Sequence, residues 1–339
     1  MKIGIVGGSF DPIHYGHIQM AKTALEQCDC QEVWFMPTQD TPLKDRSLTE
    51  SRHRVAMIEK VLAMDTRFKL CLKEVQRQGK SYTIDTLREL KQEYPDDAFV
   101  WMIGNDQLAQ FDQWKEVDQL VQLADFVCVD RDGALIQTKY PVQRIHMPMM
   151  PVSSSEIRKG NKLNYVPEAV LAYIYANRLY IKDFVKERVD EKRYRHSVSV
   201  ANLCEEMALA NGLDGQKAYL IGLFHDIAKR LPLEEMEKWM DAICPEHKHY
   251  APPVWHGFVG SEIVDRIFYL QDPEIKAAIY HHVLGTSENP YAMIVFCADK
   301  TDPLRDYDST KEIALCKKDI KAGFQWIKEE NEKYLRKEK

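Results

Sequence analysis

Strand signals occur only in the first half of this 339-residue chain, and this asymmetry restricts the fold more than any other feature. Up to about residue 180, short apolar runs alternate with helical patterns, as in a parallel sheet covered by helices on both faces. The expected strands are Lys2–Val6, Glu32–Met36, Phe68–Leu72, Phe99–Ile103 and Phe126–Val129. Helices such as Arg52–Leu62 and Thr83–Glu93 lie between them. This half therefore predicts an α/β, Rossmann-like domain with a parallel sheet, which we assign to residues 1–182.

The second half shows helical patterns alone. The expected helices are Asp190–Asn211, Gly215–Lys229, Leu233–Met240, Trp255–Phe268, Asp272–His281, Ala292–Asp299 and Thr310–Tyr334. Near residues 181–190 there is no Gly/Ser or Pro run, so we expect a short connection there. The pattern predicts an all-α domain over residues 183–339.

Charge and cysteine usage restrict the partners. The formal net charge of -6 argues against nucleic acid as a partner, because phosphate contacts require an excess of basic residues or a basic stripe. No leader and no membrane-spanning apolar run is recognisable, so we expect a cytoplasmic protein that does not enter a membrane. Eight scattered cysteines without C-x-x-C spacing are expected to be reduced. A homo-oligomer is left open.

A glycine pair and two histidines follow the first predicted strand. Gly7 and Gly8 open the segment GGSFDPIHYGH, whose backbone amides and following helix can face a phosphate. His14 and His17 are three residues apart, on one face of the first helical turn, with Gly16 between them. Taken singly, these features are an ordinary turn and surface histidines. Together they match the His/Thr-x-Gly-His signature of the nucleotidyltransferase superfamily.

A second phosphate-binding element is predicted at residues 152–158. The sequence VSSSEIR places serines at a helix start, where they can cap the helix and bond phosphate oxygens. Arg158 brings positive charge to the same element. A plain helix cap is the alternative, but Ser-Ser-x-x-Ile-Arg resembles the other phosphate-binding element of the superfamily. Ser154 and Ser155 are the predicted substrate contacts.

Residues 1–180 resemble bacterial nicotinate mononucleotide adenylyltransferases over their whole length. The matching stretches are WFMP at 34–37, PLK at 42–44, RHR at 52–54, GKSYTIDT at 79–86, IGND at 103–106, and Trp114. The resemblance implies that ATP and nicotinate mononucleotide are the substrates. It assigns substrate binding to Gly8, Ser9, Phe10, Thr83, Asp106, Trp114 and Arg131, and phosphate contact to Lys44.

The chain departs from the common family pattern at Asn105, at Ser155 and at residues 130–133. These departures put substrate preference in doubt more than reaction class. Another acceptor, such as phosphopantetheine or a cytidylyltransferase substrate, is the alternative, which residues 81–86 and Trp114 disfavour. In the expected reaction the mononucleotide phosphate attacks the α-phosphorus of ATP in line. His14, His17, Lys44 and Arg158, with Mg²⁺, are expected to hold the triphosphate.

Imidazole and carboxylate side chains recur along the helical half in the order His, His-Asp, His, His, Asp. These are ligands for borderline and hard metals, although any single one is more often an ordinary helix residue. The order and the local words YRHS, FHDIAK, WHGFVG and ADKTDPLR resemble HD-domain phosphohydrolases, in particular bacterial proteins that split diadenosine tetraphosphate symmetrically. The match covers residues 183 to about 335.

This resemblance implies six metal ligands, enough for two metal ions that share Asp226. They are His196, His225, Asp226, His256, His282 and Asp299, where His281 is the alternative to His282. Lys229 and Arg305 would bind phosphates, and iron or another divalent transition metal would activate water. A nucleoside monophosphatase, an alarmone or cyclic-dinucleotide hydrolase and a nucleotide-sensing module are the alternatives. His53, His146, His247 and His249 are left outside the site.

Overall fold

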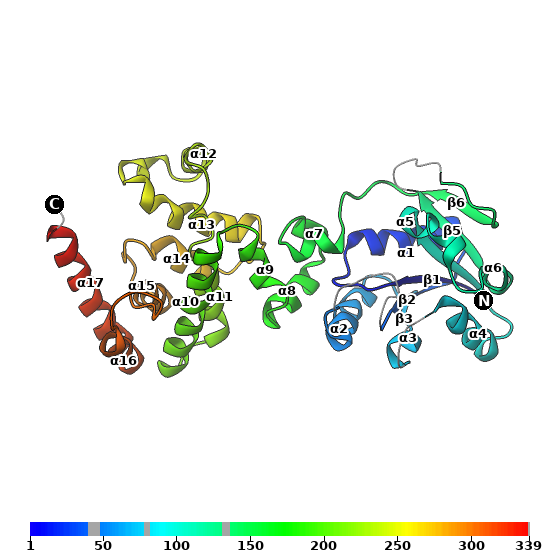
Figure 1. The fold of residues 1–339 in the computed structure, drawn as a ribbon, viewed down its shortest axis with the longest axis horizontal. Helices are drawn as coiled ribbons and strands as arrows, with labels where there is room; N and C mark the ends of the chain where they lie inside the picture. Colours follow the sequence, from blue (N-terminus) through cyan, green and yellow to red (C-terminus); the bar gives the residue numbers. More distant parts are fainter. Residues whose placement is uncertain (40–47, 78–81, 131–135, 338–339) are drawn as a thin grey trace. The chain divides into compact units, whose positions relative to one another are not determined.

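A computed structural model describes residues 1–39, 48–77, 82–130 and 136–337 of the chain. It divides into two compact units (Figure 1). The first comprises Met1–Ile157 and Asn164–Tyr173, and the second comprises Arg158–Leu163 and Ile174–Lys339. The single boundary after residue 182 stays a prediction.

The first unit is built on a parallel six-stranded sheet in the order β3-β2-β1-β4-β5-β6. The strands are β1 (Lys2–Gly8), β2 (Glu32–Pro37), β3 (Phe68–Leu70), β4 (Ala98–Gly104), β5 (Asp125–Asp130) and β6 (Val142–His146). This order is that of the Rossmann fold, so the predicted fold class is confirmed. The sixth strand was not predicted from the sequence, and β3 ends two residues earlier than expected.

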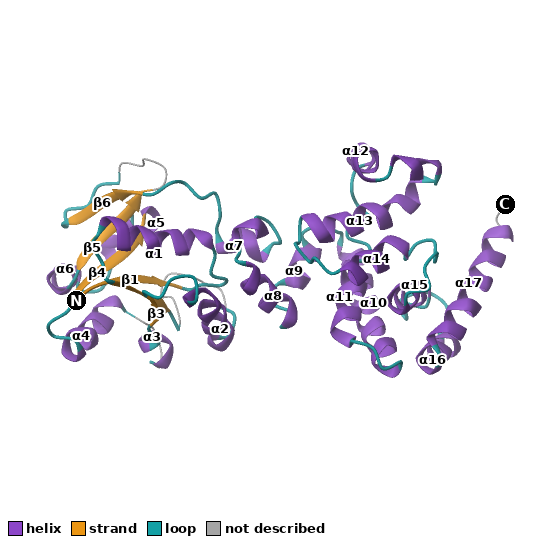
Figure 2. Cartoon of the chain, turned by 180° about the vertical axis from the view of Figure 1, so that it is seen from behind, coloured by secondary structure: helices purple, strands orange, loops and turns teal. Residues whose placement is uncertain are grey.

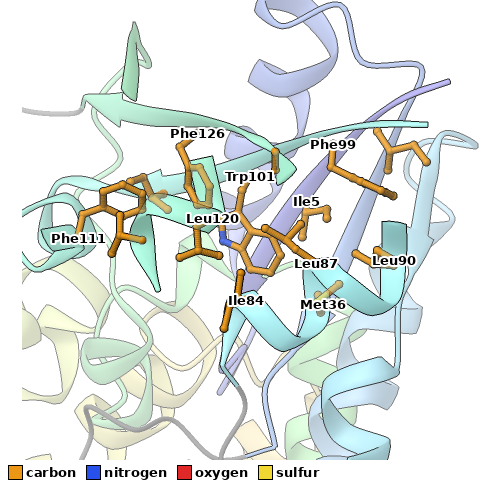
Figure 3. Packing of buried hydrophobic residues seen from close by; sticks show 14 of the residues in the cluster. Ile5, Met36, Ile84, Leu87, Leu90, Phe99, Trp101, Phe111, Leu120 and Phe126 are labelled. Atoms are coloured by element: carbon orange, nitrogen blue, oxygen red, sulfur yellow. The ribbon is translucent and has the colours of Figure 1, made fainter. Parts of the chain in front are cut away.

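A buried apolar cluster holds one face of this sheet against helices (Figure 3). Trp101 of β4 packs there with Ile84 and Leu87 of α4 (Thr83–Glu93) and Leu120 of α6 (Val117–Leu123). Burying one large apolar side chain contributes about 1.5–3 kcal/mol. On the opposite face, a Cβ on Gly4 would lie 3.1 Å from Ala24 of α1 (Tyr15–Gln27), so glycine lets this helix approach the strand closely.

Short helices complete the first unit and lead into the second. They are α2 (Ser51–Leu62), α3 (Lys73–Gln76), α5 (Asn105–Leu108), η1 (Phe111–Gln113), α7 (Ser154–Arg158), η2 (Leu163–Tyr165) and α8 (Glu168–Ala176).

The described part of the second unit is helical, without strands (Figure 2). Its helices are α9 (Ile181–Lys186), α10 (Glu191–Ala210), α11 (Gly215–Phe224), α12 (Leu233–Ile243), η3 (Pro245–His249), η4 (Pro252–Val254), α13 (Trp255–Arg266), α14 (Pro273–His281), α15 (Pro290–Lys300), α16 (Thr310–Lys318) and α17 (Ile320–Lys337). Side chains of Asp190, Asp214, Asp272 and Asn289 cap four of them, each satisfying a free backbone N–H at the helix start. Among the described residues, no helix combines the length and the apolar content that crossing a bilayer requires.

Three helical expectations are corrected. Residues 310–334 do not form one helix, because α16 ends at Lys318 and α17 begins at Ile320. The helix expected to reach Lys229 ends at Phe224, so the following His-Asp pair lies on a turn. The expected connection at residues 181–190 contains α9.

Helices α10 and α11 pack closely near the first histidine of the helical unit. A Cβ on Gly222 would lie 2.7 Å from Cα of Ala201 and 2.9 Å from the carbonyl oxygen of Val200. Real side chains do not tolerate such distances, so glycine is required for the two backbones to touch. The contact lies four to five residues after His196 on the same helix.

Candidate functional site

The predicted phosphate loop lies at the carboxyl end of β1, next to that of β4. Here the strand order reverses, and open parallel sheets bind ligands in the crevice at such a point. The backbone at Gly7 lies close to the core, because a Cβ there would lie 3.2 Å from the Trp101 ring. Phe10 is buried with φ of 47°, which turns the chain away from the strand.

Both histidines of the signature belong to the start of α1. His14 is the N-cap, and its Nδ1 accepts the N–H of Gly16 at 3.1 Å. Nδ1 of His17 accepts the N–H of His14 at 3.3 Å, and the two rings stack with centroids 3.8 Å apart. An imidazole whose Nδ1 accepts carries its proton on Nε2 when neutral. Each ring can therefore donate an Nε2–H bond to a phosphate oxygen.

The structure brings the second predicted element to the same place. Ser154 Oγ donates to the carbonyl of Pro12 at 2.9 Å, between the glycine pair and the histidines. A Cβ on Gly16 would lie 3.0 Å from the His14 ring and 3.5 Å from Val152, so the signature glycine leaves room for both. The cap of α7 is Ser153, whose Oγ accepts the N–H of Glu156 at 3.3 Å. Ser154 thus joins the two sequence elements.

Arg54 is a residue of this loop region to which the sequence assigned no role. Its side chain is fully buried, and it donates to the carbonyls of Ser9 at 2.9 Å, Thr38 at 2.8 Å and Thr49 at 2.8 Å. One guanidinium thereby joins the ends of two strands to the start of α2. The sequence feature that could have indicated a role is the RHR motif, but a run of charged residues usually forms a solvent-exposed face.

Replacing Arg54 by alanine is expected to lower the free energy of unfolding of the first unit by about 3 kcal/mol, because buried carbonyls lose charged donors. Urea unfolding followed by tryptophan fluorescence measures this. The control is Arg52→Ala, since the Arg52 side chain is 72% exposed and pairs with the exposed carboxylate of Glu50. Equal stability of the two variants would contradict the assigned role of Arg54.

The remaining predicted contacts of the first unit have different positions. Asp106 is exposed on α5, directly after β4, at the same edge of the sheet as the glycine pair. Trp114 is partly buried and packs on Phe111 and Phe126 of the core, and Thr83 is the first residue of α4. Ser155 is exposed on α7. Arg158 belongs to the second unit, and Lys44 and Arg131 lie outside the described residues, so these three assignments stay predictions.

In the second unit, the six predicted metal ligands come together from α10, the turn after α11, α13, the end of α14, and α15. Nε2 of His256 lies 3.0 Å from one oxygen of Asp226 and 3.2 Å from Nε2 of His282. Nε2 of His225 lies 3.5 Å from the other oxygen of Asp226. Nε2 of His196 lies 3.2 Å from Asp299. Residues more than a hundred positions apart thus share one cluster.

Every histidine of the cluster is held through its other ring nitrogen. In His225, His256 and His282, Nδ1 lies 2.6–2.7 Å from the carbonyl oxygen of the residue three positions earlier. In His196, Nδ1 lies 2.5 Å from the carboxylate of Asp302. Such bonds fix the tautomer that leaves Nε2 as the ligand atom. All four Nε2 atoms are therefore available to one or two ions.

Asp226 is common to two groups of three ligand atoms: one with His196 and His225, the other with His256 and His282. Nε2 of His196 and of His225 is buried without a hydrogen-bond partner. A buried polar atom of this kind requires compensation, and a cation supplies it. The donor set of imidazoles and carboxylates fits a divalent metal, as the HD order predicted.

The electrostatics of the cluster agree with this fit. Burial opposes ionisation, but histidines around Asp226 and the ammonium of Lys300 beside Asp299 hold both carboxyl pKa values well below the usual range. Burial lowers the pKa of His225 to about 4. Burial also acts on His196, but the carboxylates of Asp299 and Asp302 outweigh it and raise its pKa to about 9. Asp226 and Asp299 thus stay ionised, which is the form of a carboxyl group that binds a cation.

Two contributors were not assigned from the sequence. Asp302 is buried, and it accepts from Ser199 Oγ at 2.6 Å besides holding His196. Arg193 places Nη1 2.5 Å from Asp226. Each lies three residues from a predicted ligand, Asp302 after Asp299 and Arg193 before His196, and this spacing was the available signal.

The choice between adjacent histidines can be tested directly. The His282 side chain is buried in the cluster, whereas His281 is half-exposed and bonds Thr286 at 2.7 Å. We expect His282→Ala to lower bound metal by about one ion per chain and His281→Ala to leave it unchanged, because only the first removes a ligand atom. Elemental analysis of the purified proteins measures the bound metal. Loss of metal in His281→Ala but not in His282→Ala would show that His281 is the ligand.

A cavity of about 940 Å³ opens beside this cluster. Lys229 and Arg305, the predicted phosphate contacts, both line it. Lys229 Nζ lies 3.2 Å from His256, and Arg305 bonds the Asp299 carboxylate at 3.0 Å. Further cations at its wall are Lys192, Arg193, Arg195, Arg230 and Lys300. The same wall also carries carboxylates, among them Asp190 and Glu191, which pair with Arg230 and Arg195. Its cations are placed to contact phosphate groups near the ligand cluster.

Comparison with known proteins finds a matching family for each half of the chain. Residues 5–160 match the cytidylyltransferase-like family, and residues 193–304 match the HD domain family. A Mycoplasma pneumoniae protein named "Probable nicotinate-nucleotide adenylyltransferase/Ap4A hydrolase" is 30% identical over 334 residues, which cover 95% of this chain and 96% of that protein. The Mycoplasma genitalium protein of the same name is 31% identical, covering 90% and 88%. A Bacillus licheniformis protein named "Probable nicotinate-nucleotide adenylyltransferase" is 43% identical over 185 residues, covering 53% and 98%.

Fold and site define a nucleotidyltransferase-type α/β unit joined to an HD-type helical unit. The chain belongs to the family of two-domain nicotinate-nucleotide adenylyltransferase/Ap4A hydrolase proteins. The family expectation from the sequence is thereby confirmed.

Proposed function

We propose that this chain makes nicotinate adenine dinucleotide and diphosphate from ATP and nicotinate mononucleotide in its first unit, and splits diadenosine tetraphosphate into two ADP in its second. One observation carries the proposal: a chain of this family has two clusters of side chains suited to these reactions, the paired histidines on α1 and the His/Asp groups of the helical unit. Eight free, buried thiols support a cytoplasmic location, where cysteines stay reduced.

In the first reaction an oxygen of the mononucleotide phosphate bonds to the α-phosphorus of ATP, and the bond to the β-phosphate oxygen breaks. Diphosphate leaves with the electron pair, so no protein nucleophile is required. His14 and His17 would donate Nε2–H bonds to the phosphates, and Lys44 and Mg²⁺ would neutralise further charge. The amides after β1 and the start of α1 add their dipoles on the same side.

In the second reaction water adds to a phosphorus and an ADP group leaves. The six predicted ligands would hold one or two divalent ions, iron by family resemblance, which supply Lewis acidity and an activated water. The two oxygens of Asp226 face different histidines, which supports a role for Asp226 as a ligand common to both groups. Lys229 and Arg305 would hold the phosphates at the cavity wall and so orient the polyphosphate chain.

An acceptor panel tests the first activity. Purified protein is incubated with [α-³²P]ATP, Mg²⁺ and either nicotinate mononucleotide, nicotinamide mononucleotide or phosphopantetheine. Nicotinate mononucleotide is expected to give the highest kcat/KM. Activity with phosphopantetheine alone would overturn the proposed acceptor while leaving the nucleotidyltransferase class intact.

A substrate panel tests the second activity in the same way. Diadenosine tetraphosphate is compared with nucleoside monophosphates, an alarmone and a cyclic dinucleotide after loading with iron or manganese. Preferential cleavage of a monophosphate would replace the proposed substrate, and binding without turnover of any of them would favour a sensing module.

A further inference from the structure

The wall of the helical unit's cavity is charged except at one place. Apart from Val283, Leu304 and Tyr307, every described residue that lines it is charged or a histidine. Leu304 and Tyr307 lie within four residues of each other, on the segment between α15 and α16. This segment therefore presents a small apolar surface beside a strongly polar site.

Both side chains are open to solvent to a degree unusual for their size. Leu304 is 61% exposed and Tyr307 is 53% exposed. Moving a large apolar side chain out of water lowers the free energy of the protein. The exposed area of these two side chains adds none of this stabilisation to the fold. Exposed apolar groups grouped at a cavity commonly mark a ligand contact.

The same segment is tied to the ligand cluster by hydrogen bonds. The backbone N–H of Leu304 donates to Asp302 at 3.1 Å, and that carboxylate also holds His196. Arg305 donates to the backbone carbonyl and to the carboxylate of Asp299, both at 3.0 Å. Leu304 and Tyr307 are thus held next to a cationic group that itself contacts a predicted metal ligand.

We propose that Leu304 and Tyr307 form a nucleobase subsite, in which a purine ring of the substrate stacks on Tyr307 and contacts Leu304. Arg305 lies between them in the chain and takes a phosphate near the base, while other Lys and Arg side chains of the wall take further phosphates. The inference rests on the proposed hydrolase function and names the part of the substrate that the charged groups do not recognise. Stacking on an aromatic side chain accepts any flat base, so the subsite selects nucleotides over inorganic polyphosphate.

The test compares Tyr307→Ala, Tyr307→Phe and Trp326→Ala in the full metal-loaded chain. Trp326 is a matched control, because it is also 53% exposed but does not line the cavity. KM and kcat are measured for diadenosine tetraphosphate, together with the inhibition constant of inorganic tetraphosphate, which lacks bases. Tyr307→Ala is expected to raise KM about tenfold or more, with kcat within about twofold, because a base–aromatic stack is lost.

The inhibition constant of inorganic tetraphosphate is expected to stay the same in all proteins, and Tyr307→Phe and Trp326→Ala are expected to keep the wild-type KM. An unchanged KM in Tyr307→Ala overturns the nucleobase subsite alone. A parallel rise in the inhibition constant of tetraphosphate also overturns it, because the loss would then concern phosphate binding. Wild-type protein that leaves diadenosine tetraphosphate intact overturns the hydrolase function, and the subsite with it.

Discussion

Replacing His17 by alanine is expected to lower the rate of nicotinate adenine dinucleotide synthesis by about two to three orders of magnitude, as the loss of one placed hydrogen-bond donor does in other enzymes. The His17 ring is stacked on His14 and held by its backbone, so its Nε2–H has a fixed direction. The effect should fall on kcat more than on KM, because charge on the triphosphate increases in the transition state. Steady-state kinetics with ATP and nicotinate mononucleotide measure it.

Two controls separate this effect from damage to the fold. His146→Ala, an exposed histidine at the end of β6, should keep wild-type synthesis. Hydrolysis of diadenosine tetraphosphate by the His17 variant should also be unchanged, since the second unit has its own core and ligands. Near-normal synthesis by the His17 variant would contradict the assigned role of the paired histidines.

Replacing Asp226 by asparagine is expected to lower diadenosine tetraphosphate hydrolysis by about a thousandfold or more, because both ligand groups lose their shared anionic oxygens. Asparagine keeps the size of the side chain but removes its charge, so bound metal should fall as well. Product formation and elemental analysis measure the two consequences independently.

The matched control is Asp241→Asn, since the Asp241 side chain is 61% exposed and pairs with Lys248 at the surface. It should retain both hydrolysis and metal. Adenylyl transfer should be unaffected in either variant. Full hydrolysis by the Asp226 variant would show that hydrolysis does not require the ligand cluster.

The fold was predictable where the chain carries long periodic or fully apolar stretches. Strand β4 is almost entirely buried and was expected within one residue at each end. The edge strand β6, VQRIH, lacks a strict alternation of apolar and polar residues and buries only Ile145, so its signal is weak. The break between α16 and α17 was missed because Asp319 lies in a stretch whose composition suits one continuous helix.

The site was predictable where chemistry imposes an order along the chain. Sequence motifs predicted the histidines of α1 and the six His and Asp residues of the helical unit. The structure brings the members of each set together. Arg54 and Asp302 were not assigned a role, because their function depends on backbone and ring atoms that only the tertiary structure brings near. Likewise the sequence left His281 and His282 as alternatives, and only the fold after α14 shows that the His282 ring is the buried one.

The central claim, that a single chain joins an adenylyltransferase to a symmetrical dinucleotide hydrolase, is tested most directly by product analysis. The full chain is stripped of metal, reloaded with iron or manganese, and incubated with diadenosine tetraphosphate, and the nucleotides are resolved by chromatography. The account predicts ADP as the single nucleotide product, formed only after reloading and lost in Asp226→Asn. AMP together with ATP, or no product in the reloaded wild-type protein, would contradict it.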